Sequence, residues 1–255
     1  MDEKKLFKHC FGCSPDGFPE RVVMTPFIPV KRFAKQCDLL GDFKGQLYSG
    51  LVALKDGVKF AVVHCGLGNR LLGDAVLLLG GASVRNMLFV GACGGLNDCR
   101  IGDLLLCENA FNGEGFSRYH TRPFSIDKVF GAGQLVAADP DYTGCLKRFL
   151  TSKLPQRSDL KSGDVFTIGS LVAERQGCLA DIAERGYKGI ELELSAVFHG
   201  AREAGIKAAG IVFVSDLPME RPMWEEFTQE ERDSYDNGVR ELVRLSVDFV
   251  SEPRT

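Results

Sequence analysis

Three carboxylates follow the ends of two predicted strands, and their positions suit acid–base chemistry. Glu191 and Glu193 lie where one largely apolar strand ends, and Ser215 and Asp216 end another. Burying a carboxylate is unfavourable unless it is paired or used, and open α/β sheets bind ligands at the carboxyl ends of their strands. We therefore expect the three acids to converge on one cleft. The alternative is that Glu191 and Glu193 begin a helix, whose dipole favours acids, and that Asp216 caps a turn.

Two glycine-rich turns follow other predicted strands. They are Gly66-Leu67-Gly68-Asn69 and Gly91-Ala92-Cys93-Gly94-Gly95. Glycine at such turns lets a ligand approach backbone N–H groups. A dinucleotide-binding turn is disfavoured, because Leu71 stands where its third glycine belongs and no acid ends the next strand. A tight turn without a ligand is the alternative for each of them.

Strands and helices alternate along most of the chain. Apolar patterns predict strands at 21–25, 47–54, 59–64, 87–91, 104–107, 162–167, 187–192 and 207–214, with a hairpin turn at Asp56-Gly57. They predict helices at 29–40, 70–79, 141–151, near 172–185, at 193–204 and at 230–250. Residues 1–20 suggest an arm, and residues 108–140 suggest loops. The alternation predicts an α/β fold with a mixed sheet, as one domain over residues 21–255.

The composition excludes several classes of protein. The 255 residues are 45% hydrophobic and 25% charged, which is ordinary for a folded globular protein. The formal net charge of −3, without a basic block, disfavours nucleic acid and anionic membranes as partners. No apolar run approaches the roughly 20 residues of a membrane helix. No apolar signal core follows the charged N-terminus, so we expect a cytoplasmic protein.

The cysteines and histidines do not indicate a disulfide framework or a metal site. Nine cysteines, an odd number, favour reduced thiols. No two of the four histidines lie at metal-ligand spacing, so we expect no metal. Cys10 and Cys13 form a lone Cys-x-x-Cys, which is weak evidence for zinc or redox use. Cys93 has no histidine beside it in the sequence, which favours a small buried thiol over a nucleophile.

Several segments share their order and spacing with one known family. They are VGACGGL at 90–96, IGDL at 101–104, GEGFSRY at 113–119, SGDVF at 162–166, ELE at 191–193 and SD at 215–216. Together they resemble the nucleoside phosphorylase/nucleosidase superfamily. This superfamily includes purine nucleoside and uridine phosphorylases and the methylthioadenosine/adenosylhomocysteine nucleosidases.

That resemblance implies a single three-layer α/β domain with a mixed, partly barrel-like central sheet flanked by helices, assembled as a dimer, trimer or hexamer. It implies cleavage of the N-glycosidic bond of a nucleoside, a small-molecule partner, without a cofactor. Glu193 would hold the ribose hydroxyls, and Asp216, with a raised pKa, would protonate the leaving base. Phe166 would stack on the base, with a core aromatic as the alternative. The other implied substrate-binding residues are Glu191, Leu192 under the sugar, Thr167 at the base edge, Ala92, Cys93, Gly94 and Ser215.

The phosphate side departs from the family's pattern. FIPVK at 27–31 replaces the family's Gly-Asp-Pro-x-Arg loop, so Lys31 stands for arginine without its bidentate fork. Phe89 takes the place of an arginine on the central strand, and Ala92 that of a hydroxyl residue. Lys31, Gly66 and Arg70 are therefore the candidates for an altered phosphate site, with inorganic phosphate as co-substrate.

Three activities stay open. Phosphorolysis with an altered phosphate site is the first. Hydrolysis is the second, although the segment after the first strand contains no acid, so that Glu191 or Glu114 would have to position water. A nucleoside-binding module without catalysis is the third. Asp216 favours a purine base, while Arg175 and Gln176 leave a pyrimidine base as the alternative.

Overall fold

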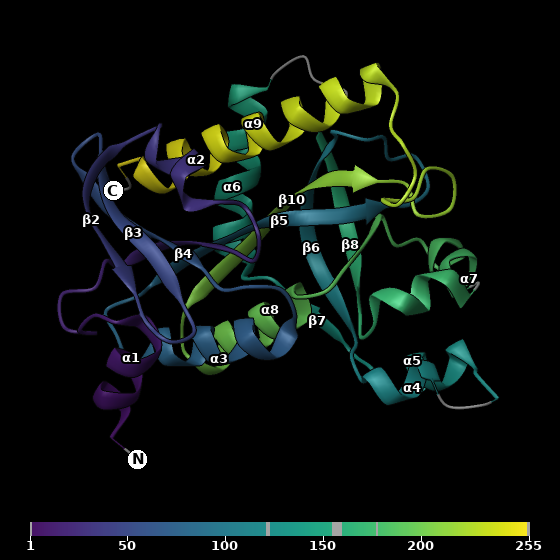
Figure 1. Ribbon diagram of the computed structural model, residues 1–255, viewed down its shortest axis with the longest axis horizontal. Helices are drawn as coiled ribbons and strands as arrows, with labels where there is room; N and C mark the ends of the chain where they lie inside the picture. The colour runs from purple at the N-terminus through teal and green to yellow at the C-terminus, as the bar shows by residue number, and fades with distance from the viewer. Residues whose placement is uncertain (1, 121–122, 155–159, 177, 254–255) are drawn as a thin grey trace.

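The computed structural model describes residues 2–120, 123–154, 160–176 and 178–253. Their strands form one ten-stranded sheet with helices on both faces (Figure 1). The strands are β1 (Arg21–Thr25), β2 (Asp38–Lys44), β3 (Ser49–Lys55), β4 (Val58–His64), β5 (Asn86–Gly95), β6 (Leu104–Gly113), β7 (Leu135–Ala137), β8 (Leu160–Ile168), β9 (Gly189–Glu191) and β10 (Lys207–Asp216). The helices are α1 (Glu3–Phe11), α2 (Val30–Ala34), α3 (Asn69–Gly80), α4 (Phe116–His120), α5 (Ile126–Ala132), α6 (Pro140–Lys153), the 3₁₀ helix η1 (Leu171–Gln176), α7 (Cys178–Glu184), α8 (Leu194–Glu203) and α9 (Gln229–Ser251).

The helices cover both faces of the sheet, which confirms the three layers expected from the sequence. Helices α9 and α6 lie along one face, while α3 and α8 pack together on the other (Figure 1). Leu242 and Phe249 of α9 are buried in a cluster with strand residues. Val76 of α3 and Val197 of α8 belong to a second buried cluster. Removal of this apolar surface from water is the main force that holds the layers together.

Five strands close into a barrel. β10 pairs with both β5 and β6, β6 pairs with β8, and β9 pairs with both β8 and β5. β1, β4, β3 and β2 continue from β5 as an open sheet, and β7 pairs with β6. Parallel and antiparallel pairs both occur, so the mixed, partly barrel-like sheet is confirmed. Closure of the barrel brings strand ends from distant parts of the sequence around one opening.

The turn between β3 and β4 forms where the sequence predicts a hairpin. Asp56 and Gly57 have φ angles of 51° and 78°. Two successive residues with positive φ are typical of a type I′ turn, whose twist matches that of the flanking strands.

Two expectations about secondary structure are wrong. The helix predicted at 29–40 ends at Ala34, and the chain then forms β2, which pairs antiparallel with β3. Phe43 is the one buried side chain of β2, so this edge strand has no alternating apolar pattern by which to recognise it. Residues 108–140 are not mainly loops, because β6 continues to Gly113 and α4, α5 and β7 follow it.

The first 20 residues do not form an irregular arm. The Asp2 side chain caps α1, and Gly12, with a φ of 76°, ends the helix in the left-handed conformation. Phe7 and Phe11 are buried, with ring centroids 4.3 Å apart. Together with Phe18, Phe43 and Tyr48 they form what we call the N-terminal aromatic cluster. This cluster belongs to the same core as α3, so the segment packs against the rest of the domain.

Candidate active site

The strands that carry the predicted acids flank one strand of the barrel. Gly94 of β5 pairs with Ile190 of β9 on one side and with Asp216 of β10 on the other. Glu191, Glu193 and Asp216 are 4%, 3% and 4% exposed. The structure therefore brings the three acids to the same end of β5, and all three are buried there.

Glu191 supports the start of α8. One oxygen of its carboxylate accepts the N–H groups of Glu193 and Leu194 at 2.7 and 2.6 Å, and the other accepts the Thr167 hydroxyl. Burial raises the pKa of Glu191. The Thr167 hydroxyl in turn accepts the Ser195 N–H at 3.1 Å. The side chains of Glu191 and Thr167 are thus engaged with the protein, which favours a supporting role over the substrate contact expected from the sequence.

Glu193 connects α8 to the glycine turn before α3. Its Oε1 accepts the Gly68 N–H at 2.8 Å. Burial, with a smaller effect of the Glu191 charge, raises the pKa of Glu193 to about 8. A carboxyl group in this state holds its proton at neutral pH. Its hydrogen bond to Gly68 joins the acid motif at 191–193 to the glycine turn at 66–69.

Asp216 is held by two hydrogen bonds. Its Oδ1 accepts the Ser215 hydroxyl at 2.7 Å, and its Oδ2 accepts the Met223 N–H at 3.0 Å. Burial raises the pKa of Asp216, and these two hydrogen bonds oppose the increase. A raised pKa is what a general acid requires near neutral pH.

Glu174 in η1 is an acid that the sequence analysis missed. Burial, and to a smaller extent the Asp216 charge, raises the pKa of Glu174 to about 7. Nothing in the sequence around Glu174 indicates a site, because the fold, and not the sequence spacing, brings Glu174 close to Asp216.

The other residues of the second glycine turn form tight backbone contacts. Cys93 is buried, and burial raises the pKa of its thiol well above the usual value, which argues against a thiolate nucleophile. A Cβ atom on Gly94 would lie 2.3 Å from Pro218 Cγ, so glycine allows the segment after Asp216 to pack on β5. The Ser215 hydroxyl also donates to the Cys93 carbonyl at 3.1 Å.

Phe166 is not placed to stack on a base. It is 0% exposed, and its ring lies 5.3 Å from that of Phe111, 5.4 Å from that of Phe130 and 5.6 Å from that of Tyr187. A ring that stacks on a base needs one face open to the cleft, whereas this ring is fully buried among aromatic neighbours. The core-aromatic alternative therefore fits the structure, and the stacking role is corrected.

A cavity of about 780 Å³ opens beside the acids. We call it the α3–α4 cavity. It is lined by Leu67, Gly68, Asn69, Arg70, Leu71, Asn112, Glu114, Gly115, Phe116, Arg118, Ala132, Ile168, Gly169 and Leu192. Leu192 and Arg70 both line this cavity. Of these residues the sequence analysis did not single out Asn112 or Ala132, because they lie in the segment expected to be loops.

The expected phosphate side is filled by apolar side chains. Phe89 is 1% exposed, and Phe27 and Ala92 pack against the buried cluster of the α9 face. Lys31 is exposed on α2, and neither Lys31 nor Gly66 lines the α3–α4 cavity. Of the three predicted phosphate residues, the structure brings Arg70 alone to this cavity.

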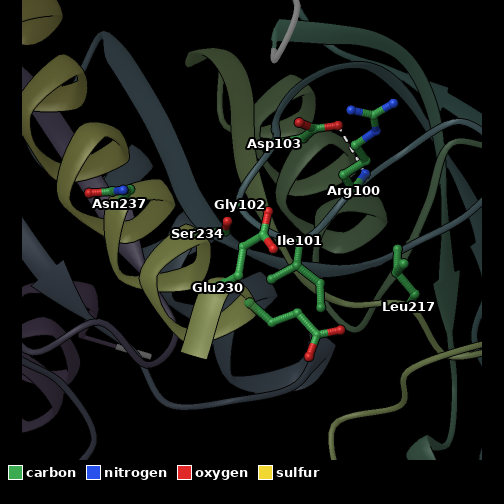
Figure 2. Close-up of a pocket in the computed structure, with 9 residues that line it drawn as sticks. Arg100, Ile101, Gly102, Asp103, Leu217, Glu230, Ser234 and Asn237 are labelled. Atoms are coloured by element: carbon green, nitrogen blue, oxygen red, sulfur yellow. Dashed lines mark hydrogen bonds between the residues drawn. The ribbon is translucent and has the colours of Figure 1, made fainter. Parts of the chain in front are cut away.

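A second cavity of about 430 Å³ lies near the start of α9. Figure 2 shows its residues on the turn at Arg100–Asp103, on Leu217 and on α9, with Asp103 bonded to the Arg100 N–H at 2.9 Å. Gly102 allows the close approach, since a Cβ atom there would lie 2.4 Å from the Ser234 carbonyl oxygen. None of the predicted site residues lines it.

Other kinds of site were also sought. Among the described residues, no three His, Cys, Asp or Glu side chains are grouped to hold a metal ion. Each of the nine cysteines, all within the described ranges, is a free thiol. No helix in the described part of the chain is long and apolar enough to cross a membrane.

The closed barrel, its two layers of helices and the buried acids at its strand ends define an α/β protein of the nucleoside phosphorylase-like fold. Residues 32–251 match the family model of the phosphorylase superfamily. The chain therefore belongs to the phosphorylase superfamily.

Its relatives and structural neighbours come from several branches. It is 26% identical over 209 residues to a DeoD-type purine nucleoside phosphorylase of Bacillus velezensis, an alignment that covers 79% of this chain and 80% of the relative. Uridine phosphorylase from Vibrio fischeri superposes with a TM-score of 0.73 at 20% identity over 91% of each chain. The 5′-methylthioadenosine/S-adenosyl homocysteine nucleosidase of Campylobacter jejuni gives 0.70 at 15% identity, over 91% of this chain and 97% of that one.

Proposed function

We propose that this protein cleaves the N-glycosidic bond of a nucleoside, with a purine base favoured. One observation carries the proposal: β9 and β10 bring Glu193 and Asp216 to the same end of β5, where both are buried and the pKa of each is raised. This arrangement supplies one acid for the sugar and another for the base.

The reaction requires charge to be stabilised at both ends of the breaking bond. As the bond breaks, its electron pair moves to the base nitrogen and positive charge grows on the sugar. Asp216, oriented by Ser215 and the Met223 N–H, donates a proton to the leaving base. Glu193 forms hydrogen bonds with the ribose hydroxyls and, in its protonated state, donates a hydrogen bond to one of them; Leu192 lies beneath the sugar.

Water is the acceptor that the packing supports. Phe27, Phe89 and Ala92 occupy with apolar groups the positions at which the family resemblance implies a phosphate site. Glu191 is fully engaged, whereas the Glu114 carboxylate lines the α3–α4 cavity and accepts one hydrogen bond, from the Ser195 hydroxyl at 3.1 Å. Glu114 is therefore the residue that we assign to orient the water. The water oxygen bonds to the sugar carbon as the bond from that carbon to the base breaks, and the proton of the water passes to solvent.

Phosphorolysis with an altered phosphate site is the second candidate. It is favoured by Arg70, a cation in the α3–α4 cavity, and by the activity in the name of the Bacillus velezensis relative. Here an oxygen of inorganic phosphate would bond to the sugar in place of water.

Release of free base from a panel of nucleosides, with and without phosphate, tests these proposals. Release without phosphate supports hydrolysis, and release only with phosphate supports phosphorolysis. If no nucleoside is cleaved but one of them raises the melting temperature, the protein is a binding module and the proposed enzymatic function is wrong.

A homo-oligomer is part of the proposal. Leu67 and Phe116 are 60% and 66% exposed, and both line the α3–α4 cavity. Exposed apolar side chains grouped in this way are typical of protein interfaces. Light scattering after gel filtration should give a dimer, trimer or hexamer, and a monomer would contradict this expectation.

A further inference from the structure

The α3–α4 cavity contains two arginines without acidic partners. Arg70 and Arg118 both line it, and within the described ranges neither forms an ion pair. Arg118 donates one hydrogen bond, to the Glu114 backbone carbonyl at 3.0 Å. Arg70 and Arg118 are both exposed, and two unpaired arginines that line one cavity suit a doubly charged oxyanion, because arginine presents several N–H donors in a fixed plane.

The backbone of the same cavity adds further donors. Helix α3 begins there, after Gly68, whose N–H is used by Glu193. The next N–H groups, of Asn69 and Arg70, have no acceptor among the residues that the structure describes. The first N–H groups of a helix and its dipole favour an anion, so they reinforce the two arginines.

A buried acceptor in the cavity also lacks a partner. The Asn69 Oδ1 atom is buried and receives no hydrogen bond from any described residue. An acceptor of this kind is completed by a hydroxyl donor, and a sugar has several. The cavity therefore fits a ligand that combines hydroxyl groups with an anion.

The position of the cavity tells which end of the nucleoside it would meet. Leu192 lines it and Glu193 bonds to its Gly68, whereas Asp216 and Met223 are not among its lining residues. The base is protonated at Asp216, so the cavity lies on the sugar side of the site. The 2′ and 3′ hydroxyls of the ribose are assigned to Glu193, so the 5′ carbon is the substituent that remains for the cavity.

We propose that the α3–α4 cavity binds a phosphate ester on the 5′ carbon, so that the preferred substrate is a nucleoside 5′-monophosphate. This inference rests on the proposed cleavage of the N-glycosidic bond and names its substrate class. Arg70 and Arg118 contact the phosphate, and Asn69 accepts a sugar hydroxyl. The same phosphoryl chemistry is offered by free inorganic phosphate, which the experiment has to separate from the ester.

The test compares adenosine with adenosine 5′-monophosphate as substrates of the full-length protein. We expect kcat/KM for base release to be at least tenfold higher for the monophosphate, without added phosphate. Arg70→Gln and Arg118→Gln should each lower the ratio of the two kcat/KM values at least tenfold. Arg85→Gln is the matched control, because Arg85 is exposed and pairs with Glu20 at the opposite end of β5; it should leave the ratio unchanged.

Each other outcome has a distinct meaning. A ratio of one or less overturns the inference and leaves the proposed function intact. Arginine variants that change the dependence on inorganic phosphate but not the ratio also overturn it, since the cavity then serves the free ion. If neither compound releases base, the proposed function fails. The inference about the cavity then stands only if the monophosphate, and not adenosine, raises the melting temperature and Arg70→Gln abolishes that shift.

Discussion

The two sides of the Gly91–Gly95 run differ in chemistry, although they belong to one site in the family pattern. On one side, the ends of β9 and β10 carry buried acids whose carboxyl oxygens accept specific hydrogen bonds. On the other side lies the segment after β1, where Pro26 approaches Gly91 and Phe27 packs in an apolar cluster with Phe213.

The difference teaches that the two halves of such a site can change independently. The acids on the first side need partners, because an unpaired buried carboxylate is strongly unfavourable. Phe27 and Phe89 on the second side need only apolar neighbours, and their burial adds to the core. In the proposed function, the apolar side is core, and the acid side is the one that we assign to the sugar and base.

The largest effect is expected on the acid side. Asp216→Asn should lower kcat for base release by about 100- to 10,000-fold, because the amide cannot donate the catalytic proton, while KM changes little. Steady-state kinetics on the preferred nucleoside measure this. Asp98→Asn, a change at an exposed acid paired with Lys188, is the control. Full activity in Asp216→Asn would show that another group protonates the base.

On the apolar side, Phe89→Ala should lower the free energy of unfolding by about 3–5 kcal/mol, because Phe89 is a fully packed core residue. Phe116→Ala, at a 66% exposed side chain, should change it by less than about 0.5 kcal/mol. Urea unfolding measures both. A loss below about 1 kcal/mol for Phe89→Ala would mean that this side keeps space for a ligand, and the contrast between the two sides would disappear.

Glu193→Gln should change how stability depends on pH. The pKa of Glu193 is about 8 in the folded protein and near 4.5 when the group is unperturbed, so the folded state holds a proton that the unfolded state loses. The free energy of unfolding of the wild type, relative to the glutamine variant, should fall as pH rises from about 5 to 8, by up to about 1.4 kcal/mol per pH unit. Urea unfolding at each pH measures it, with Glu203→Gln as the exposed control. Parallel curves would rule out a raised pKa.

The smallest effect concerns the segment that holds Asp216. Arg221 binds both oxygens of Glu231 at 3.0 Å, and this ion pair fixes the segment whose Met223 N–H donates to Asp216. Arg221→Gln should therefore lower kcat by about fivefold or less, because such pairs contribute about 1 kcal/mol or less. Steady-state kinetics measure it.

Arg221→Gln should also move the alkaline limb of the pH–rate profile to higher pH. Loss of the Met223 hydrogen bond removes an interaction that favours the charged form of Asp216, so its proton is released later. Arg221→Lys keeps the charge without the bidentate geometry and should give an intermediate shift. An unchanged limb in both variants would show that Met223 stays in place without the ion pair.

The parts of the fold that could be predicted have local signals. The positive-φ turn at Asp56-Gly57, the apolar face of α3 and the Thr228–Glu231 capping box of α9 are each encoded within a few residues. β2 could not be predicted, because an edge strand exposed on both faces has no pattern. In α1, the spacing of Phe7 and Phe11 was a usable signal, but the charged residues around them obscured it.

The candidate site was predictable where it depends on strand ends. Glu193 and Asp216 were expected to meet because ligands bind at the carboxyl ends of strands in open α/β sheets. In the structure they meet because β10 pairs parallel, and β9 antiparallel, with the end of β5. Phe166 was assigned wrongly, since no pattern distinguishes a ring that faces a cleft from one enclosed by Phe111 and Tyr187. Arg70 and Arg118 line one cavity because the fold brings the start of α3 close to α4, and sequence spacing cannot show such proximity.

The N-terminal aromatic cluster is connected to the start of α3 by a hydrogen bond. The Tyr48 hydroxyl, which belongs to this cluster, donates to the Leu71 carbonyl at 2.9 Å, in the first turn of α3. A truncation that removes residues 1–11 would delete Phe7 and Phe11 and expose the other rings of the cluster. It would thereby weaken the hydrogen bond from Tyr48 to the start of α3. Under the proposed function, removal of α1 would weaken ligand binding at the start of α3, so assays of the proposed activity need protein with an intact α1.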